Sequence, residues 1–470
     1  MKEDTTAIRV QNEALMTNVG EILTQIKGFQ AGHRGIEEWM DDISALTSYA
    51  ETAYAETVAY AETSYAESVA EPAESSTPPP AESTATDTTV SLPIHQDDGP
   101  IPPSAKAATD DTTLFEPVYQ QGDPGHGIGG YDLRSESDRC FALDYNSTGK
   151  LDHLVLFRPG TGLITILQNT AGVFTSVYQS ASGIGTFDIL SPLDRAVAFD
   201  YTGSGCLDHI IFYRPGYNVI YILGRLNATY TAVFESQSGI GGVLSLGSPR
   251  DRIFAFDYNH SGKQDHLAVY RPGMGEFWIF RNDMQSGGTF TPVYDPGRPG
   301  QGIGNFDLIR EHDRAFAFDW DGTGKMDHIV LYRSGDGILY VVKNDNGKFI
   351  AVWASHWTGE GGVPAQGVGE YNLADRRDVA FAYDWAHTGR RDHIALYRPG
   401  TGTFWVIARD GNGWEPVFHE GDPGRGVGGY DLMHERDTVF AFDHDGKGKS
   451  DGLVVYRANG TGTIWILKHV

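Results

Sequence analysis

The chain is poor in cysteine, in basic residues and in long apolar stretches. Its 2 cysteines, Cys140 and Cys206, are too few for a disulfide framework in 470 residues, so both are predicted to be free thiols. No stretch of about 18 apolar residues occurs, so no membrane span is expected. The 36 Lys and Arg residues stand against 62 Asp and Glu, a net charge of −26, which disfavours binding to nucleic-acid phosphates.

The residues after Met1 also lack the apolar segment of a secretory signal peptide. We therefore expect a cytoplasmic protein, or one that is released without a conventional signal peptide. Glycine, by contrast, is abundant at 58 residues and follows no collagen-like period, which indicates many tight turns. The acidity is uneven, because residues 1–112 hold 20 acidic and 5 basic residues.

Residues 1–70 are predicted to be helical. Apolar side chains recur there at alternating intervals of four and three residues, with Asn12 at one position of the seam. A short coiled coil would explain this pattern and would make the chain a homo-oligomer through residues 8–43. A helical hairpin that covers its own apolar stripe explains it equally well. Residues 71–113 are acidic and rich in Pro, Ser and Thr, which predicts a linker.

A unit of about 60 residues recurs six times after the linker. Each copy contains four short runs of β-branched and aromatic residues bounded by Gly, Asn, Asp or Pro, and such runs are typical of β-strands. Four strands per repeat is the pattern of a propeller blade. The first run of each copy is followed by an aspartate, at Asp144, Asp200, Asp257, Asp319, Asp384 and Asp443.

The two ends of the repeat region complement each other. The last copy stops at Val470 without a fourth strand, and a matching segment, 115–133, precedes the first copy. An N-terminal strand that completes the last blade would close the ring and leave no open edge. We therefore predict an all-β fold over residues 114–470, a six-bladed β-propeller of four-stranded blades closed by its N-terminal strand.

A loop between the first and second strand of each copy has the pattern Asp-x-(Asn/Asp)-x-(Ser/Thr)-Gly-x-x-Asp, numbered below from position 1 to position 9. Oxygen donors at positions 1, 3, 5 and 9, with a Gly for the sharp turn, are typical of a calcium site. With this motif, residues 114–470 resemble the FG-GAP/VCBS repeats of integrin-like propellers and of fungal propeller lectins of the Psathyrella velutina type. The resemblance implies calcium in these loops. The implied ligands are Asp144, Asn146, Asp152, Asp257, Asn259, Asp265, Asp319, Asp321, Asp327, Asp443, Asp445 and Asp451.

The loops depart from the resembled pattern in ways that favour weak calcium binding. Position 5 is Thr or Ser in five copies and Lys447 in the sixth, where a carboxylate or amide is usual. Position 3 is Thr202 and Ala386 in two copies, which weakens those loops as well. The alternative is a metal-free turn that is held by bonds from the Asp side chain to the backbone.

A His follows position 9 in five copies, and an Arg ends the second strand in all six. Because each His lies in its own blade, we predict packing or hydrogen bonding within the blade rather than a shared metal belt. For the arginines we predict pairing with a carboxylate of the same blade.

Nearly every distinctive residue is repeated five or six times, which suits equivalent binding pockets better than one active site of unlike groups. We therefore expect that the chain is not an enzyme. Aromatic residues recur in the third strand, where packing between blades is favoured, and at position 2, where contact with a ligand is favoured. The predicted ligand-binding residues are Tyr145, Tyr201, Tyr258, Trp320 and Trp385.

The fungal propeller lectins bind sugar between blades. The resemblance therefore implies a multivalent carbohydrate-binding protein, a lectin with glycans or glycoproteins as partners. The competing hypothesis is a protein-interaction scaffold or toxin-associated module, with the N-terminal helices as its oligomerisation or effector part.

Overall fold

A computed structural model of the chain describes residues 114–122, 125–283, 288–295, 297, 300–355, 367–411, 413–420 and 424–470. All of them belong to one compact unit, Pro102–Val470. The predicted helices of residues 1–70, their possible contact through residues 8–43 and the linker of residues 71–113 lie outside the described residues. Where the structure describes the chain, it contains no helix with the length and apolar character that crossing a membrane requires.

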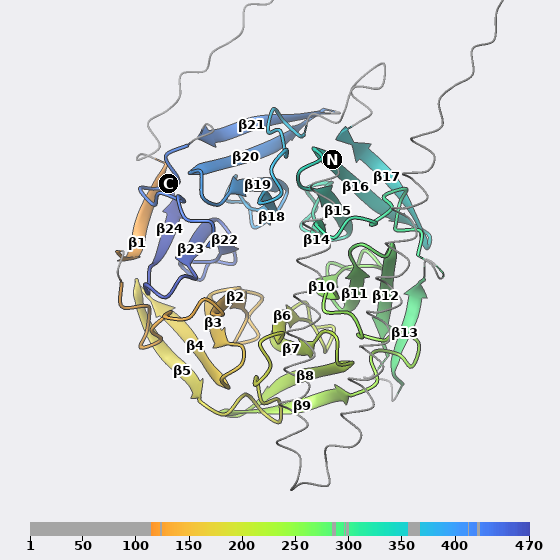
Figure 1. Cartoon of the computed structure of the whole chain (residues 1–470), viewed down its shortest axis with the longest axis horizontal. Helices are drawn as coiled ribbons and strands as arrows, with labels where there is room; N and C mark the ends of the chain where they lie inside the picture. Colours follow the sequence, from red (N-terminus) through yellow and green to blue (C-terminus); the bar gives the residue numbers. More distant parts are fainter. Residues whose placement is uncertain are drawn as a thin grey trace, which may run out of the picture. The chain divides into compact units, whose positions relative to one another are not determined.

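The described residues form six four-stranded antiparallel sheets, which are the blades of a ring (Figure 1). Blade I consists of β2 (Arg139–Leu143), β3 (His153–Arg158), β4 (Leu163–Thr170) and β5 (Val173–Ser180). Blade II consists of β6 (Arg195–Phe199), β7 (His209–Arg214), β8 (Val219–Leu226) and β9 (Thr229–Ser236). Blade III consists of β10 (Arg252–Phe256), β11 (His266–Arg271), β12 (Glu276–Asn282) and β13 (Phe290–Tyr294).

The other three blades repeat this order from the inner to the outer strand (Figure 1). Blade IV consists of β14 (Asp313–Phe318), β15 (His328–Arg333), β16 (Ile338–Asp345) and β17 (Lys348–Ala354). Blade V consists of β18 (Val379–Tyr383), β19 (His393–Arg398), β20 (Thr403–Asp410) and β21 (Gly413–Glu420). Blade VI consists of β22 (Asp437–Phe442), β23 (Gly452–Arg457), β24 (Ile464–His469) and β1 (Phe115–Gln121).

The second strand of each blade is apolar on both faces, because each sheet is packed between two neighbouring sheets. In β7, for example, His209 to Tyr213 are all buried and only the last residue, Arg214, is partly exposed. The fourth strands alternate between buried and exposed residues, as β9 does, because they lie at the rim of the ring (Figure 1). The predicted six-bladed architecture is confirmed.

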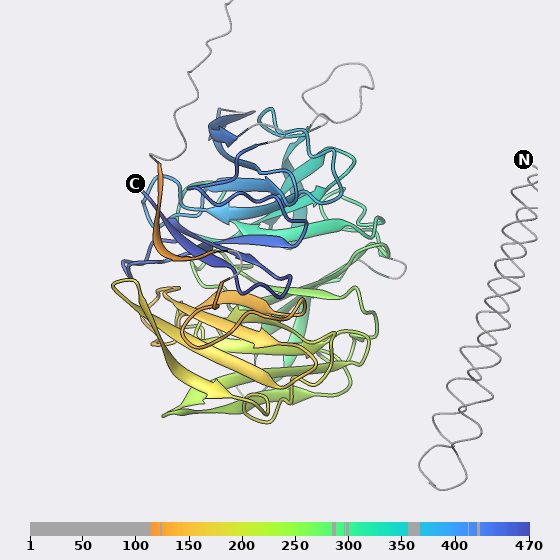
Figure 2. The same ribbon diagram turned by 60° about the vertical axis from the view of Figure 1, so that its left-hand side comes forward.

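The ring is closed as the ends of the repeat region predict. Strand β1 pairs with β24 in an antiparallel register from Phe115 opposite His469 to Gln121 opposite Ile464. The two strands lie side by side at the edge of blade VI (Figures 1 and 2). The sheet of blade VI is therefore built from both ends of the described unit, and β24 has no open edge.

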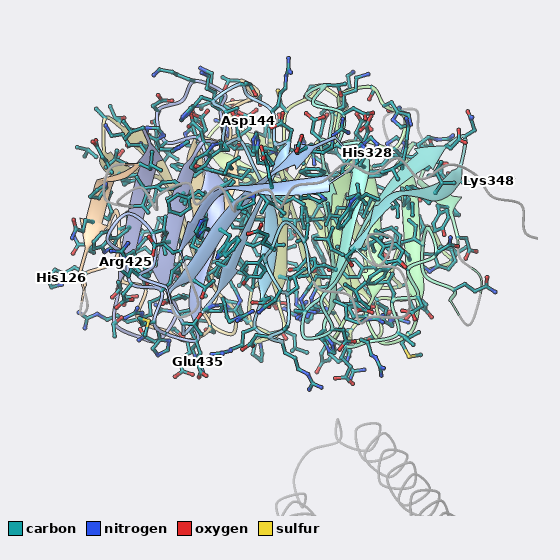
Figure 3. All side chains as sticks on the ribbon, turned by 90° about the horizontal axis from the view of Figure 1, so that it is seen from above. His126, Asp144, His328, Lys348, Arg425 and Glu435 are labelled. Carbon is teal, nitrogen blue, oxygen red and sulfur yellow. The ribbon has the colours of Figure 1, made fainter. Side chains whose placement is uncertain are left out.

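The strands run between two faces of the ring, seen from the side in Figure 3. The loops that hold positions 1 to 9 lie on one face, called the loop face below, and Asp144 marks it (Figure 3). The turns that follow the second strands lie on the opposite face, called the turn face, which Glu435 marks (Figure 3). Both features therefore recur six times around the ring, at opposite ends of the same strands.

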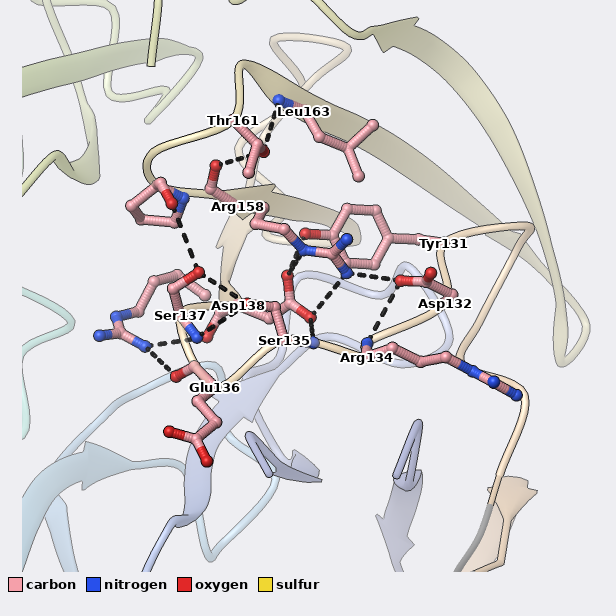
Figure 4. A network of polar contacts seen from close by, with 12 residues as sticks. Tyr131, Asp132, Arg134, Ser135, Glu136, Ser137, Asp138, Arg158, Thr161 and Leu163 are labelled. Atoms are coloured by element: carbon pink, nitrogen blue, oxygen red, sulfur yellow. Dashed lines mark hydrogen bonds and ion pairs between the residues drawn. The ribbon is translucent and has the colours of Figure 1, made fainter. Parts of the chain in front are cut away.

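On the turn face, each blade holds an Arg paired with a buried Asp. In blade I, Arg158 donates from Nε to Asp138 Oδ1 at 2.8 Å and from a terminal nitrogen to Oδ2 at 3.0 Å (Figure 4). Tyr131 donates its hydroxyl to the same carboxylate at 2.6 Å. The equivalent pairs are Arg214–Asp194, Arg271–Asp251, Arg333–Asp313, Arg398–Asp378 and Arg457–Asp437. The predicted pairing of these arginines with carboxylates of their own blades is confirmed.

His469, near the end of the closing pair of strands, lies against blade V. Its ring centroid lies 3.9 Å from that of Trp385 and 4.5 Å from that of His387. Burial, followed by repulsion from His387, lowers the pKa of His469 from 6.5 to about 4. The contact between blades V and VI therefore favours the neutral imidazole.

We expect the free energy of unfolding to fall as the pH is lowered from about 6.5 to about 4. The pKa of His469 is lower in the folded chain than in the unfolded chain. Its contribution to the free energy of unfolding is therefore complete at a pH above the unfolded-state pKa. Below that pH the unfolded chain binds a proton that the folded chain does not, and the contribution is lost. Because solvent reaches part of the side chain, we expect a loss of about 1–2 kcal/mol. Urea unfolding of the wild type and of His469→Gln at both pH values measures it. A variant that retains the full pH dependence would contradict this assignment.

Candidate functional site

Each loop on the loop face is a tight turn built around its position-1 aspartate. Asp144 is 1 % exposed, and its Oδ1 and Oδ2 accept the backbone N–H groups of Thr148 at 2.8 Å and Gly149 at 2.7 Å. Gly149 has a φ of 79°, a conformation that glycine adopts without strain. The same two bonds recur in the other five loops. The bonds from the Asp side chain to the backbone, which define the metal-free alternative, are therefore present in all six loops.

The predicted calcium ligands at positions 1 and 3 do not converge. The position-1 carboxylates are buried, and burial raises the pKa values of Asp257, Asp319 and Asp443 in spite of the amides that bond them. Both oxygens of these groups are already occupied by backbone N–H donors. The position-3 side chains are exposed, and these are Asn146, Asn259, Asp321 and Asp445.

The position-9 carboxylates are engaged by histidines. Asp152, Asp265 and Asp327 each accept a bond from Nδ1 of the following His, and Asp451 pairs with Nδ1 of His387 at 2.8 Å. No group of three or more His, Cys, Asp and Glu side chains is placed to hold a metal ion in the part of the chain that the structure describes. This arrangement does not fit a calcium cage. Calcium binding stays a prediction, and nothing below depends on it.

The position-2 rings that were predicted to contact a ligand lie at the junctions between blades. Tyr145 and Tyr201 are 8 % and 7 % exposed, and Tyr258, Trp320 and Trp385 pack against the apolar core. The three tyrosines donate their hydroxyls to carbonyls on the fourth strand of their own blade. These bonds are Tyr145 to Val177 at 3.5 Å, Tyr201 to Val233 at 3.3 Å and Tyr258 to Val293 at 3.2 Å.

A side chain from the third strand of the next blade lies against position 2 at each of these junctions. The Arg225 guanidinium lies 4.2 Å from the centroid of Tyr145, and that of Arg409 lies 4.7 Å from the centroid of Trp320. His469 covers Trp385, whereas Asn282 and Asn344 each donate to the position-2 carbonyl at 2.8 Å. A sugar that stacked on Tyr145, Trp320 or Trp385 would have to displace the side chain that already covers the ring.

The junction between blades VI and I differs from these five. Position 2 is His444 instead of Tyr or Trp, and the residue after position 9 is Gly452 instead of His. A Cβ atom on Gly452 would lie 3.1 Å from His444 Nδ1, so the imidazole takes the space of the missing His side chain. His444 Nδ1 also lies 3.6 Å from Asp451 Oδ1. The ring of His444 is therefore directed inward, toward the second strand of its own blade.

A cavity of about 630 Å³ opens at this junction. Val118 of β1, in its wall, is the counterpart of the valines whose carbonyls accept the tyrosine hydroxyls in blades I, II and III. The cavity thus lies where those blades hold a tyrosine side chain. Its polar wall consists of Asp152, Asn169, His444 and Asp445, and small residues, Ala171, Gly172 and Gly446, leave it open.

The cavity also holds a carboxylate oxygen that Gly446 leaves accessible. In blades I, III and V, position 4 is Ser147, His260 or His387, which bonds Oδ2 of the position-9 Asp of the next blade at 2.6–2.8 Å. Position 4 of blade VI is Gly446, and a Cβ there would lie 3.4 Å from Asp152 Oδ2. Asp152 therefore keeps one oxygen on His153 and presents the other toward the cavity.

The sequence carries a signal for this site in the sixth copy of the repeat. His444 and Gly452 are visible departures from the shared pattern; His444 lies in the loop that Lys447 makes the least suitable for calcium, and Gly452 directly follows that loop. The opposite wall of the cavity belongs to blade I, at the other end of the repeat region. From that wall, Asn169 donates to the carbonyl of His444. Sequence reasoning therefore missed Asn169 and the cavity, because their neighbours are set by ring closure.

A second, smaller cavity of about 150 Å³ lies on the axis of the ring, where position-6 glycines and position-8 residues of all six loops meet. Position 8 is charged only in blade V, at Arg391, which donates to Gln264 Oε1 at 2.9 Å. Burial lowers the pKa of Arg391, and the carboxylates of Asp319 and Asp384 oppose that shift. We interpret this guanidinium as a counter-charge to the buried position-1 carboxylates.

Comparisons with known proteins find only distant likenesses to solved structures. No family model and no curated protein matches the chain. The periplasmic gluconolactonase of Pseudomonas aeruginosa is 14 % identical with a TM-score of 0.32, over 67 % of this chain and 80 % of that one. An auxiliary nutrient binding protein from Bacteroides thetaiotaomicron is 12 % identical with a TM-score of 0.40, over 76 % of each chain. The Cps50 β-propeller domain of Myceliophteria thermophila is 9 % identical with a TM-score of 0.35, over 70 % and 96 %.

The prediction about catalysis has to be corrected. The chain was expected not to be an enzyme, because repeated residues suit repeated pockets. The similar structures include one named as a periplasmic gluconolactonase, so the prediction that the chain is not an enzyme does not stand. The resemblance to FG-GAP/VCBS repeats and to fungal lectins stays an interpretation of the sequence. What the described residues show is a six-bladed β-propeller of four-stranded blades.

Proposed function

We propose that the chain binds carbohydrate, in the cavity between blades VI and I on the loop face. The single observation that carries the proposal is the space of about 630 Å³ that opens where other blades hold a tyrosine. This volume lies within the range of about 300–1,000 Å³ that is typical of small-molecule sites. Two carboxylates, an amide and an imidazole supply acceptors and donors for the hydroxyl groups of a sugar.

The proposal predicts a single carbohydrate site per chain. The multivalent binding predicted from the repeats would use equivalent sites at several junctions, whereas five of the junctions contain a packed ring at position 2. We therefore expect one sugar per chain in calorimetric titrations. A stoichiometry near six would instead mean that the covering side chains move aside and that the position-2 rings also bind.

A glycan array probed with the full chain tests the proposal directly. We expect binding to a restricted set of glycans, and a second array in the presence of a calcium chelator reports whether calcium supports it. A blank array, with circular dichroism showing folded protein, would overturn the proposal. It would leave the protein-interaction scaffold or toxin-associated module as the function to test.

Filling the cavity provides a sharper prediction. His444→Tyr restores the residue of blades I to III, and its ring should occupy the space near Val118 and weaken sugar binding by at least about tenfold. The substitution also removes the pairing of His444 with Asp451 at 3.6 Å, and the melting temperature reports that cost separately from the loss of binding. Calorimetry and thermal melting check both effects. Tyr217→Ser, an exposed position on the turn face, is the control that should leave binding unchanged, and unchanged binding in His444→Tyr would contradict the location of the site.

A further inference from the structure

The cavity between blades VI and I is acidic. Asp152 and Asp445 line it, and none of its lining residues is Lys or Arg. Lys447 pairs with Asp445 at 2.6 Å, but its side chain is 71 % exposed, so solvent screens this charge. The cavity therefore presents a negative potential to a ligand.

Asp152 is the group best placed to meet a positive charge. Its Oδ1 is held by His153 at 2.6 Å, which fixes the orientation of the carboxylate. Its Oδ2 lies toward Gly446, at the position where Ser147 bonds the equivalent Asp208 at 2.6 Å in the next junction. The carboxylate is thus oriented by one partner and has its second oxygen available to a ligand.

Two other junctions also have a glycine at position 4. They show that this glycine alone does not create an open cavity beside the position-9 carboxylate. Asp265 faces Gly203 and Asp392 faces Gly322, at 3.6 Å and 3.5 Å from the Cβ that each glycine lacks. Position 2 of those loops, however, is Tyr201 or Trp320, which packs against the junction. At the junction of blades VI and I, the position-9 carboxylate has an accessible oxygen, and position 2 also lacks the Tyr or Trp ring that fills the other junctions.

We propose that this cavity selects a sugar that carries a protonated amine, an amino sugar, with Asp152 as its counter-charge. An ammonium group has three hydrogen-bond donors and no acceptor. It can therefore donate to the accessible oxygen of Asp152 and at the same time neutralise the negative charge of the cavity wall. A hydroxyl or an acetylated amine at the same ring position can donate one bond but leaves the charge uncompensated. This inference rests on the proposed function, since it names the class of sugar for the same site.

Isothermal titration of the full chain with glucosamine, N-acetylglucosamine and glucose tests the inference. We expect glucosamine to bind about tenfold more tightly than the other two at low ionic strength. At about 1 M salt, where the Debye length is about 3 Å, the difference should shrink. Equal binding of the three sugars would overturn the selectivity and leave carbohydrate binding standing. Absence of binding by these sugars together with a blank glycan array would overturn both proposals.

A matched pair of variants locates the counter-charge. Asp152→Asn keeps the shape and hydrogen-bonding capacity of the side chain but removes its charge, so the preference for glucosamine should be lost. Asp392→Asn makes the same change beside Gly322, at the junction of blades IV and V that the Trp320 ring fills. In this variant the preference for glucosamine should persist. If both variants lose it equally, or neither does, Asp152 is not the selecting group.

A second variant guards against a folding defect in Asp152→Asn. Gly446→Ser introduces the residue that blade I has at position 4, where Ser147 adopts a φ of 55° close to the 68° of Gly446. Its hydroxyl should bond Asp152 Oδ2 and weaken glucosamine binding more than glucose binding. A Gly446→Ser protein that is folded and binds glucosamine as the wild type does would overturn the role of this oxygen.

Discussion

Replacing Asp313 by alanine is expected to lower the free energy of unfolding by about 3–5 kcal/mol. The carboxylate is 0 % exposed and accepts two bonds from Arg333, at 2.7 Å and 2.9 Å, and a third from the backbone N–H of Arg310 at 2.9 Å. Arg333 itself is only 8 % exposed. Removing the carboxylate leaves the Arg310 amide without this acceptor and leaves the buried guanidinium with the half-exposed Asp307 alone, so much of the cost of burying the guanidinium is uncompensated.

Urea unfolding followed by tryptophan fluorescence measures this loss, with Asp283→Ala as the control. Asp283 pairs with Arg281 at 2.7 Å, and the Arg281 side chain is 54 % exposed. Removing the Asp283 carboxylate should therefore cost less than about 1 kcal/mol of unfolding free energy. The double variant Asp313→Leu/Arg333→Met, which removes both charges, should recover part of the loss. Equal losses for Asp313→Ala and Asp283→Ala would mean that burial does not determine the strength of these pairs.

The Arg and Asp pairs show what the spacing of a repeat can predict. An Asp before the first strand and an Arg at the end of the second are 20 residues apart in all six copies, and two antiparallel strands joined by a tight turn bring such residues to the same end. The partners lie within one blade, so local chain geometry determines the contact. The strands and turns follow from the same local patterns, and the closing strand β1 follows from the match between segment 115–133 and the fourth strand that the last copy lacks.

The candidate site could not be derived in this way, because its partners belong to different blades. Asn169 and His444 are 275 residues apart and meet only when the ring closes. The aromatic residues at position 2 looked accessible from their polar neighbours, but side chains such as Arg225 from the next blade cover them. The oxygen-rich loop pattern predicts calcium, and that stays a prediction; the sequence did not show that the backbone N–H groups of the turn bond the Asp144 carboxylate.

Ring closure itself leads to the second prediction with a large effect. Phe115→Ala, at the start of β1, is expected to cost about 3–5 kcal/mol of unfolding free energy. Phe115 is 1 % exposed, and its ring centroid lies 5.5 Å from that of Phe418 and 5.1 Å from that of His469. The substitution leaves a cavity between blades V and VI and weakens the anchorage of the strand that completes blade VI.

Phe290→Ala in β13 is the matched control, because Phe290 holds the equivalent position in blade III and is 0 % exposed. Its equilibrium cost should be similar, but β13 continues directly from β12 in the same blade, whereas β1 is joined to β24 by hydrogen bonds alone. Hydrogen exchange of the β1 and β24 amides should therefore accelerate in Phe115→Ala ahead of global unfolding, and no such local opening should follow Phe290→Ala. The opened edge of β24 should also make the first variant the more prone to aggregation. If both variants show the same uniform exchange, β1 opens only with the whole ring, and closure is as cooperative as the pairing within any other blade.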